Sequence, residues 1–181
     1  MNLEPVRRVL DALNSRYALI GAHAMAARGY PRFTVDIDVL TSDLRVLDAA
    51  VWDDLAREGA QIDARRGEPD DPLGGVVHVL LRDGTDVDVV VAKWKWEADL
   101  LERAEELPVA GAPIGVPRLA DLILLKLAAG GHLDLHDAVA LLAVGDRPTV
   151  VREVEEHIDQ VRPDVHASWR TVLAAVDEKS D

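Results

Sequence analysis

Two aspartates, Asp36 and Asp38, occupy alternate positions of an apolar segment. Side chains two residues apart in a β-strand point to the same side of a sheet. The pattern therefore predicts a strand that carries both carboxylates on one face and presents Val35, Ile37 and Val39 to the core. Two like charges held this close favour a bound cation. The alternative is a pair of solvated strand residues, because acidic residues are mostly exposed and are common in this chain.

The sequence before this segment has the features of a phosphate-binding turn. Residues 17–20 (YALI) predict a short buried strand that stops at Gly21, and residues 22–28 predict an alanine-rich helix that ends at Gly29. The first amides of a helix have no partner within the helix and point outward at the positive end of its dipole. Phosphate donors beside paired carboxylates favour a nucleoside triphosphate (NTP) held with Mg²⁺, which prefers oxygen ligands.

A further pair of acids lies in a predicted hairpin. Residues 76–81 are apolar and largely β-branched, an Asp-Gly pair after them predicts a tight turn, and residues 85–92 predict the returning strand. Asp86 and Asp88 share one face of that strand, and a hairpin in the same sheet would bring one of them beside the first pair. Three carboxylates with substrate phosphates suit one or two magnesium ions. The alternative is that both acids only solubilise an exposed face.

Residues 17–40, YALIGAHAMAARGYPRFTVDIDVL, resemble the signature of the polymerase-β-type nucleotidyltransferase superfamily, and within it the AbiEii-like toxins of bacterial toxin–antitoxin systems. Members of that branch commonly have a Gly-Gly-x-Ala helix start, a Gly-x-x-Arg-x-Thr run and Asp-x-Asp. The corresponding segments here are GAHA at 21–24, GYPRFT at 29–34 and DID at 36–38. The resemblance continues through Asp88, the Arg103-Ala104 pair, the lysine helix ADLILLKL at 120–127 and DLHD at 134–137.

The resemblance implies a fold and a reaction. The fold class is α+β, with a nucleotidyltransferase-like mixed β-sheet flanked by helices and a C-terminal helical bundle. Asp36 and Asp38 would bridge two Mg²⁺ ions, one activating an acceptor hydroxyl and one holding the β- and γ-phosphates of the NTP donor. Asp88, preferred to Asp86 for its spacing to the Arg-Ala pair, would ligate the first ion and receive the acceptor proton. Lys126 completes the implied catalytic set, and the implied nucleotide-binding residues are Gly21, Ala22, Arg32, Thr34, Lys126 and Asp137.

Several of these positions allow other interpretations. Many nucleotidyltransferases have Gly-Ser where this chain has Gly21-Ala22, so only backbone amides are available there. The basic residue that often precedes the late acid is replaced by GGH at 130–132. Lys126 lies in an apolar helix, and its alternative role is to bury its aliphatic chain while its amine reaches solvent at the rim of the helix. Arg32 fits a phosphate contact or an ion pair with a nearby acid.

Net charge separates the candidate acceptors. The formal charge is −13, with 33 acidic and 20 basic residues, which disfavours a large RNA-binding face because phosphate contacts supply much of the affinity for RNA. The toxin-like resemblance nevertheless implies an RNA (tRNA) or a protein as acceptor and a cognate antitoxin as partner. One alternative is a nucleotidyltransferase for a small cationic antibiotic of the aminoglycoside type, a class within the same superfamily. The other is a catalytically silent nucleotide-binding module.

The composition predicts a cytoplasmic protein with a substantial core. Apolar residues make up 49% of the 181 residues, there is no cysteine, and no apolar run reaches membrane-spanning length. The N-terminal MNLEPVRRVLDAL predicts an amphipathic helix rather than a signal peptide. We expect residues 1–116 to form the nucleotidyltransferase core and residues 117–181 a C-terminal helical subdomain, with the donor nucleotide bound between them. The pattern does not determine the oligomeric state.

The remaining patterns predict mostly helix. Helices are expected at 42–57, 96–107, 118–129, 135–143, 149–161 and 164–177, with a short irregular hairpin at 109–116 and a mobile loop at 65–75. The KWKW run at 93–96 fits either a nucleic-acid contact or the sealing of a core edge. His132, Asp134 and His136 could form a zinc site, but an N-cap role of Asp134 for the helix at 135–143 is simpler. We expect His23 to be a packing or surface residue.

Overall fold

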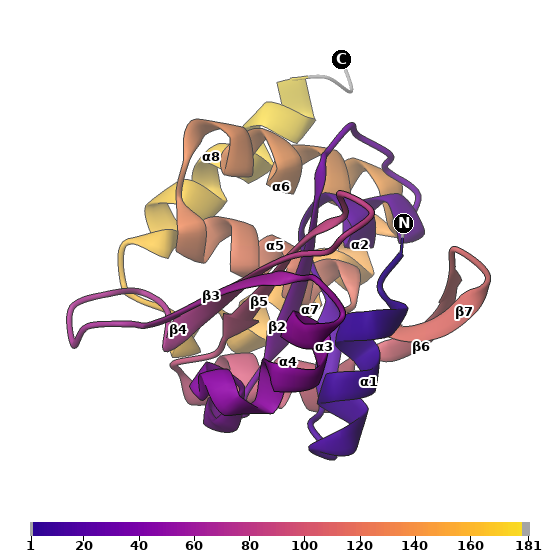
Figure 1. The fold of residues 1–181 in the computed structure, drawn as a ribbon. Helices are drawn as coiled ribbons and strands as arrows, with labels where there is room; N and C mark the ends of the chain where they lie inside the picture. The colour runs from indigo at the N-terminus through magenta and orange to yellow at the C-terminus, as the bar shows by residue number, and fades with distance from the viewer. Residues whose placement is uncertain (1, 179–181) are drawn as a thin grey trace.

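The computed structural model describes residues 2–178 and contains a mixed five-stranded sheet between two groups of helices (Figure 1). Its strands are β1 (Tyr17–Leu19), β2 (Asp36–Thr41), β3 (Gln61–Arg66), β4 (Gly75–Leu80) and β5 (Asp86–Val91). Their order across the sheet is β1-β2-β5-β4-β3. The pair β2 and β5 is parallel and the other neighbours are antiparallel. Met1 and residues 179–181, at the ends of the two predicted domains, lie outside the described residues.

The central strands have one buried and one partly open face. In β5 the alternate valines are fully buried, whereas Asp86 and Asp88 between them remain partly exposed. The neighbouring β2 repeats this alternation, with Ile37 and Val39 buried. This confirms the predicted strand with its acids on one face. Val35, however, precedes β2 and is 73% exposed, so its predicted place in the core is wrong.

Helices pack on both sides of the sheet. On one side lie α1 (Glu4–Ala12), the short α3 (Asp53–Arg57) and α4 (Lys95–Arg103), as Figure 1 shows. The other side holds the C-terminal helices α5 (Leu119–Ala129), α6 (His132–Val144), α7 (Arg147–His157) and α8 (Val165–Glu178), and α2 (Gly21–Ala27) packs against α5. The α+β class with a C-terminal helical bundle is therefore confirmed. The division of the chain at residue 116 stays a prediction.

One hydrophobic core joins the sheet to the C-terminal helices. Buried residues of β2, β4 and β5 belong to the same cluster as buried residues of α5 to α8. An ion pair of 2.5 Å between Arg103, at the end of α4, and the buried Asp121 of α5 links the two parts through polar atoms. Within residues 2–178, no helix combines the length and the apolar composition that crossing a membrane would require.

The predicted helix at 42–57 is wrong. Two 3-10 turns, Leu44–Leu47 and Ala49–Trp52, precede the short α3 instead. The side chains of Asp43 and Asp48 each accept a hydrogen bond from the amide two residues further on, at 2.9 and 3.0 Å. Short acidic side chains that bind nearby amides start new turns and compete with a continuous helix.

Other boundaries also differ from the prediction. The helix expected at 96–107 ends at Arg103, and the hairpin expected at 109–116 is longer, with strands β6 (Glu105–Val109) and β7 (Ala112–Val116). The strand β3 was not predicted, and its end overlaps the expected loop at 65–75. The helix α6 begins at His132, so Asp134 is not its N-cap. Its carboxylate instead accepts a hydrogen bond of 3.2 Å from the amide of Gly131, the residue before the helix.

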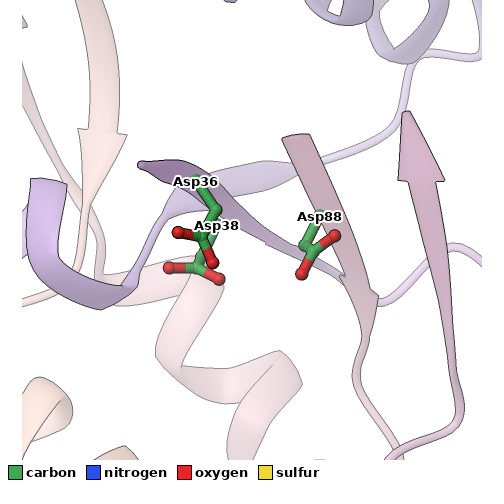
Figure 2. A group of neighbouring side chains, drawn as sticks. All are labelled: Asp36, Asp38 and Asp88. Carbon is green, nitrogen blue, oxygen red and sulfur yellow. The ribbon is translucent and has the colours of Figure 1, made fainter. Parts of the chain in front are cut away.

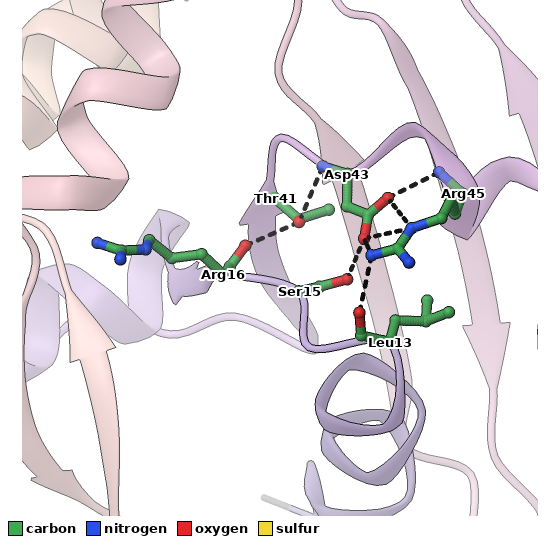
Figure 3. Close-up of polar contacts among 6 residues, drawn as sticks. All are labelled: Leu13, Ser15, Arg16, Thr41, Asp43 and Arg45. Atoms are coloured by element: carbon green, nitrogen blue, oxygen red, sulfur yellow. Dashed lines mark hydrogen bonds and ion pairs between the residues drawn. The ribbon is translucent and has the colours of Figure 1, made fainter.

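A polar cluster fixes the end of β2 to the preceding chain (Figure 3). The Thr41 hydroxyl donates to a backbone carbonyl just before β1 at 2.8 Å, and the Asp43 carboxylate accepts hydrogen bonds from the side chains of Ser15 and Arg45. The Arg45 side chain, together with the Ser15 hydroxyl and the Arg45 amide, holds the pKa of Asp43 well below its usual range. The cluster anchors β2 at the end opposite to its paired aspartates.

Candidate active site

Three aspartates converge on the open face of the sheet. The parallel pairing of β2 and β5 places Asp36 opposite Asp86 and Asp38 opposite Asp88. Carboxylate oxygens of Asp36, Asp38 and Asp88, one from each residue, lie within 4.8 Å of one another (Figure 2). Asp86 is not part of this group, although it shares a face of β5 with Asp88. Sheet geometry alone therefore assembles a cluster of three acids from two distant segments.

The donor set of this cluster fits magnesium. All the side chains offer hard carboxylate oxygens, which Mg²⁺ prefers to nitrogen or sulfur, and one side of the cluster is open to water and substrate oxygens. Burial, and after it the negative charges of Asp36 and Asp88, raise the pKa of Asp38 from 3.8 to about 6. A cation would remove this repulsion, so the three residues are suited to hold a divalent ion.

Gly21 fits closely against Asp38. It begins α2 with a φ of +61°, and a Cβ added there would lie 2.0 Å from Asp38 Oδ2. Both the backbone angle and the lack of space require glycine at this position. The next residue, Ala22, is buried as a whole residue and offers no polar side chain to a ligand. The predicted phosphate-binding turn therefore lies directly beside the paired acids.

Positive side chains lie near the acids. Lys126 on α5 and Arg32, in the loop before β2, both lower the pKa of Asp38, less than the burial and the acids raise it. Lys126 Nζ lies 2.8 Å from Asp137 Oδ2 and 2.9 Å from Asp134 Oδ1 on α6, and Arg32 Nε lies 3.3 Å from Asp137 Oδ2. Arg32 and Lys126 are partly exposed. The structure thus brings both predicted cations to the cluster.

Asp137 is fully buried beneath these cations. With no exposed surface it cannot touch a nucleotide in this conformation, although the resemblance implied a nucleotide-binding residue. Its contacts with Lys126 and Arg32 are ion pairs that do not meet the angles of good hydrogen bonds, so charge attraction compensates its burial. Asp137 therefore holds the two cations in place.

Two further side chains contact Asp36. The Thr34 hydroxyl donates to Asp36 Oδ1 at 3.1 Å. Burial lowers the pKa of His23, while a hydrogen bond to the Asp36 backbone partly opposes that effect. His23 Nδ1 is buried and has no hydrogen-bond partner within the described chain. The packing role expected for His23 agrees with its position, and Thr34 lies where it can orient the Asp36 carboxylate.

The weaker sequence candidates do not join the cluster. Among residues 2–178, Asp36, Asp38 and Asp88 are the one group of three potential metal ligands whose ligand atoms lie close together. The side chains of the alternative zinc site, His132, Asp134 and His136, do not form such a group. Lys93 donates to backbone carbonyls of the 65–75 loop, and Trp96 is buried, which supports the sealing of a core edge. Trp94 is half exposed.

One residue at the site was missed from the sequence. His78 lies on β4 directly opposite Asp88, and its Nδ1 is 2.5 Å from Asp88 Oδ1. A signal existed, because His78 interrupts an apolar strand at a position that alternates with Val77 and Val79 and so faces the open side. Without the strand register, no partner for it could be named.

Comparisons with known proteins identify the fold. No protein-family model and no curated protein matches the sequence. Similar solved structures include the antibiotic-resistance factor ANT(2'')-Ia in solution, with 17% identity, a TM-score of 0.55 and coverage of 98% of this chain and 94% of that chain. The crystal structure of ANT(2'')-Ia with adenylyl-2''-tobramycin gives 15% identity, a TM-score of 0.57 and coverage of 87% and 95%. The crystal structure of the lincosamide antibiotic adenylyltransferase LnuA with bound lincomycin gives 13% identity, a TM-score of 0.51 and coverage of 79% of this chain and 96% of that chain.

These neighbours are nucleotidyltransferases, and the similarity extends over most of each chain. The chain therefore has the nucleotidyltransferase fold. At these identities the comparison establishes the fold alone. The expectation of an AbiEii-like branch rests on the sequence motifs and stays a prediction.

Proposed function

We propose that this chain is a Mg²⁺-dependent nucleotidyltransferase that moves a nucleoside monophosphate from an NTP to a hydroxyl acceptor. The observation that carries the proposal is the convergence of Asp36, Asp38 and Asp88 beside the cations Lys126 and Arg32. Oxygen ligands for a metal and positive charges for phosphates are the two requirements of phosphoryl chemistry. The nucleotidyltransferase fold places this arrangement in a suitable framework.

The three aspartates would hold the metal, with two ions expected. Bound Mg²⁺ neutralises phosphate charge and favours ionisation of the acceptor hydroxyl. The raised pKa of Asp38 supports this assignment, since a carboxyl group that resists ionisation alone gains the most from a nearby cation.

The chain's own residues would bind the donor and move one proton. The turn at Gly21-Ala22, where Gly21 is partly exposed, and the side chains of Arg32 and Lys126 would bind the triphosphate, while the Thr34 hydroxyl orients Asp36. The acceptor oxygen attacks the α-phosphorus, the bond to the bridging oxygen of the β-phosphate breaks, and pyrophosphate leaves. The acceptor proton passes to Asp88. Positioning and charge neutralisation supply most of the catalysis in such a reaction.

The first candidate acceptor is an RNA, such as tRNA, or a protein, with the chain acting as the toxin of a toxin–antitoxin pair. Support comes from the sequence motifs at 21–38 and 120–137. The donor NTP and Mg²⁺ are abundant in the cytoplasm, where we place the protein. Growth arrest on expression, relieved by the product of a neighbouring gene, would test this role and identify the antitoxin.

The second candidate acceptor is a small hydroxyl-bearing cation. A cavity of about 340 Å³ is lined by residues of β3, β4 and β5, including the polar residues Gln61, Asp63 and Asp86 and also His78, which contacts Asp88. Carboxylates attract a cationic ligand, and this volume is within the usual ~300–1,000 Å³ of small-molecule sites. The neighbour ANT(2'')-Ia was crystallised with adenylyl-2''-tobramycin.

Transfer of label from α-³²P-NTPs tests both acceptors. The purified chain is incubated with Mg²⁺ and each of the four labelled NTPs, with total RNA, cell protein or a panel of aminoglycosides and lincosamides. We expect one acceptor class to be labelled, and Asp36→Ala or Asp38→Ala to abolish the labelling. The exposed Asp70, on the loop between β3 and β4, provides Asp70→Ala as a matched control that keeps activity. No labelling of any acceptor would favour the silent nucleotide-binding module, which Mg²⁺-dependent turnover requiring Asp88 would exclude.

A further inference from the structure

A row of polar side chains crosses the open face of the sheet. Asp38 on β2 lies opposite Asp88 on β5, Asp88 lies opposite His78 on β4, and His78 lies opposite Asp63 on β3. Within this row His78 makes the closest contact, 2.5 Å from its Nδ1 to Asp88 Oδ1. His78 thus lies outside the three-aspartate cluster and touches only the member that comes from β5.

The contact has a defined direction. A carboxylate that ligates a metal ion is ionised and can only accept hydrogen bonds, so in the metal-bound state His78 Nδ1 carries the hydrogen and donates it to Asp88 Oδ1. This donation needs no charge on the imidazole. It occupies one carboxylate oxygen and leaves the two lone pairs of Asp88 Oδ2 for the metal and for the acceptor proton. A free aspartate side chain would rotate about its last torsion, whose energy is broad and shallow.

In the sheet His78 lies between Asp88 on β5 and Asp63 on β3. The Asp63 carboxylate on the other side of His78 is itself held by Arg65, 2.5 Å away. His78 is half exposed, and it also lines the cavity next to Gln61 and Asp86. The imidazole therefore forms the boundary between the three-aspartate cluster and the cavity.

We propose that His78 is a positioning residue that fixes the Asp88 carboxylate for metal binding and for receipt of the acceptor proton. The proposal rests on the proposed function, because it assigns Asp88 to the metal and the acceptor. Hydrogen-bond partners of metal ligands typically contribute ~10–100-fold to metal affinity or activity. A histidine that only covers the sheet face would contribute to stability and leave metal affinity unchanged.

The test compares variants with and without the donor. His78→Leu removes the N–H, whereas His78→Asn keeps an N–H close to the position of Nδ1. The matched control is His166 on α8, which also forms a His–Asp pair, 3.0 Å from Asp159, and has a similar exposure of 42% against 45% for His78. His166→Leu removes an equivalent pair far along the chain from the aspartates.

Binding of Mn²⁺ alone, followed by electron paramagnetic resonance of the free ion, is the main measurement. We expect His78→Leu to weaken Mn²⁺ affinity by about 10-fold or more, and His78→Asn to restore it to within about 3-fold of the native protein. His166→Leu should leave it unchanged. In transfer assays His78→Leu should lower kcat while KM for the NTP changes little, because the triphosphate contacts lie on the Gly21 and Lys126 side. Thermal unfolding confirms that each variant folds.

The outcomes separate this proposal from the proposed function. Equal Mn²⁺ affinity of the native protein and His78→Leu would overturn the role of His78 while leaving nucleotidyl transfer intact. Equal losses in His78→Leu and His78→Asn would also overturn it, because the N–H would then be irrelevant. A native protein that binds Mn²⁺ but transfers no nucleotide would refute the proposed function, and the affinities would still decide whether His78 positions Asp88. A native protein that binds no Mn²⁺ would refute both.

Discussion

Replacing Asp38 with asparagine should stabilise the metal-free protein at neutral pH. The pKa of Asp38 is raised from 3.8 to about 6, chiefly by burial and then by the charges of Asp36 and Asp88. Between these values the native state holds a proton that the unfolded chain has lost, so the stability of the native protein falls as pH rises from about 4 to about 6. Each pKa unit is worth ~1.4 kcal/mol, which gives a loss of up to ~3 kcal/mol.

Asp38→Asn has no charge to lose and should escape this decline. We expect the variant to be ~1–3 kcal/mol more stable than the native protein at pH 7.5, the lower bound allowing for relaxation of the neighbouring carboxylates, and nearly equal to it at pH 4. Urea unfolding in EDTA at both pH values measures the difference. With Mg²⁺ and NTP the order should reverse, because only the native site gains stability from binding.

The control for this measurement is Asp70→Asn, which removes a charge from an exposed loop. Its stability relative to the native protein should change little between pH 4 and pH 7.5. If Asp38→Asn differs from the native protein by the same amount at both pH values, or is less stable at pH 7.5, the explanation by buried like charges is refuted.

Three further changes test other parts of the site. Gly21→Ala should lower the free energy of unfolding by at least ~1–2 kcal/mol because of the positive φ, and it should also displace Asp38 so that Mn²⁺ binding is lost. The control Gly84→Ala, where φ is +85° and no atom lies within 4 Å of the added Cβ, should lower stability alone. Equal Mn²⁺ binding by the two variants would contradict the argument. Asp137→Asn should reduce the free energy of urea unfolding by ~3 kcal/mol, because Lys126 loses a buried partner, and a change below ~1 kcal/mol would be inconsistent with that pairing. Lys126→Met should raise KM for the NTP about tenfold, equivalent to ~1.4 kcal/mol, and an unchanged KM would exclude a phosphate contact.

The strands that build the site could be predicted because their apolar residues alternate. Val87 and Val89 on one face and Asp86 and Asp88 on the other leave little choice of orientation. β3 escaped prediction because it is an edge strand rich in charged residues, where pairing to a single neighbour overrides low strand propensity. The helix expected at 42–57 failed because local aspartate side chains compete for its amides, an effect that periodicity ignores.

The site could be predicted only in part. Asp36, Asp38 and the Gly21 turn are close in sequence, so local geometry predicts their proximity. The contacts of Asp88 with both β2 and His78 depend on strand order and register, which no local pattern encodes. Burial was equally out of reach, since only the packing of α5 against α6 shows that Asp137 lies beneath Lys126 rather than at the surface.

The parallel pairing of β2 with β5 also has a consequence for the time at which the site forms during folding. Parallel neighbours cannot be joined by a tight turn, and here the chain between Asp38 and Asp88 contains β3 and β4. Closing such a long loop is slow compared with forming a hairpin. Metal affinity should therefore appear late in refolding, after the β3–β4–β5 meander, so that a stopped-flow Mn²⁺ signal would report completion of the sheet.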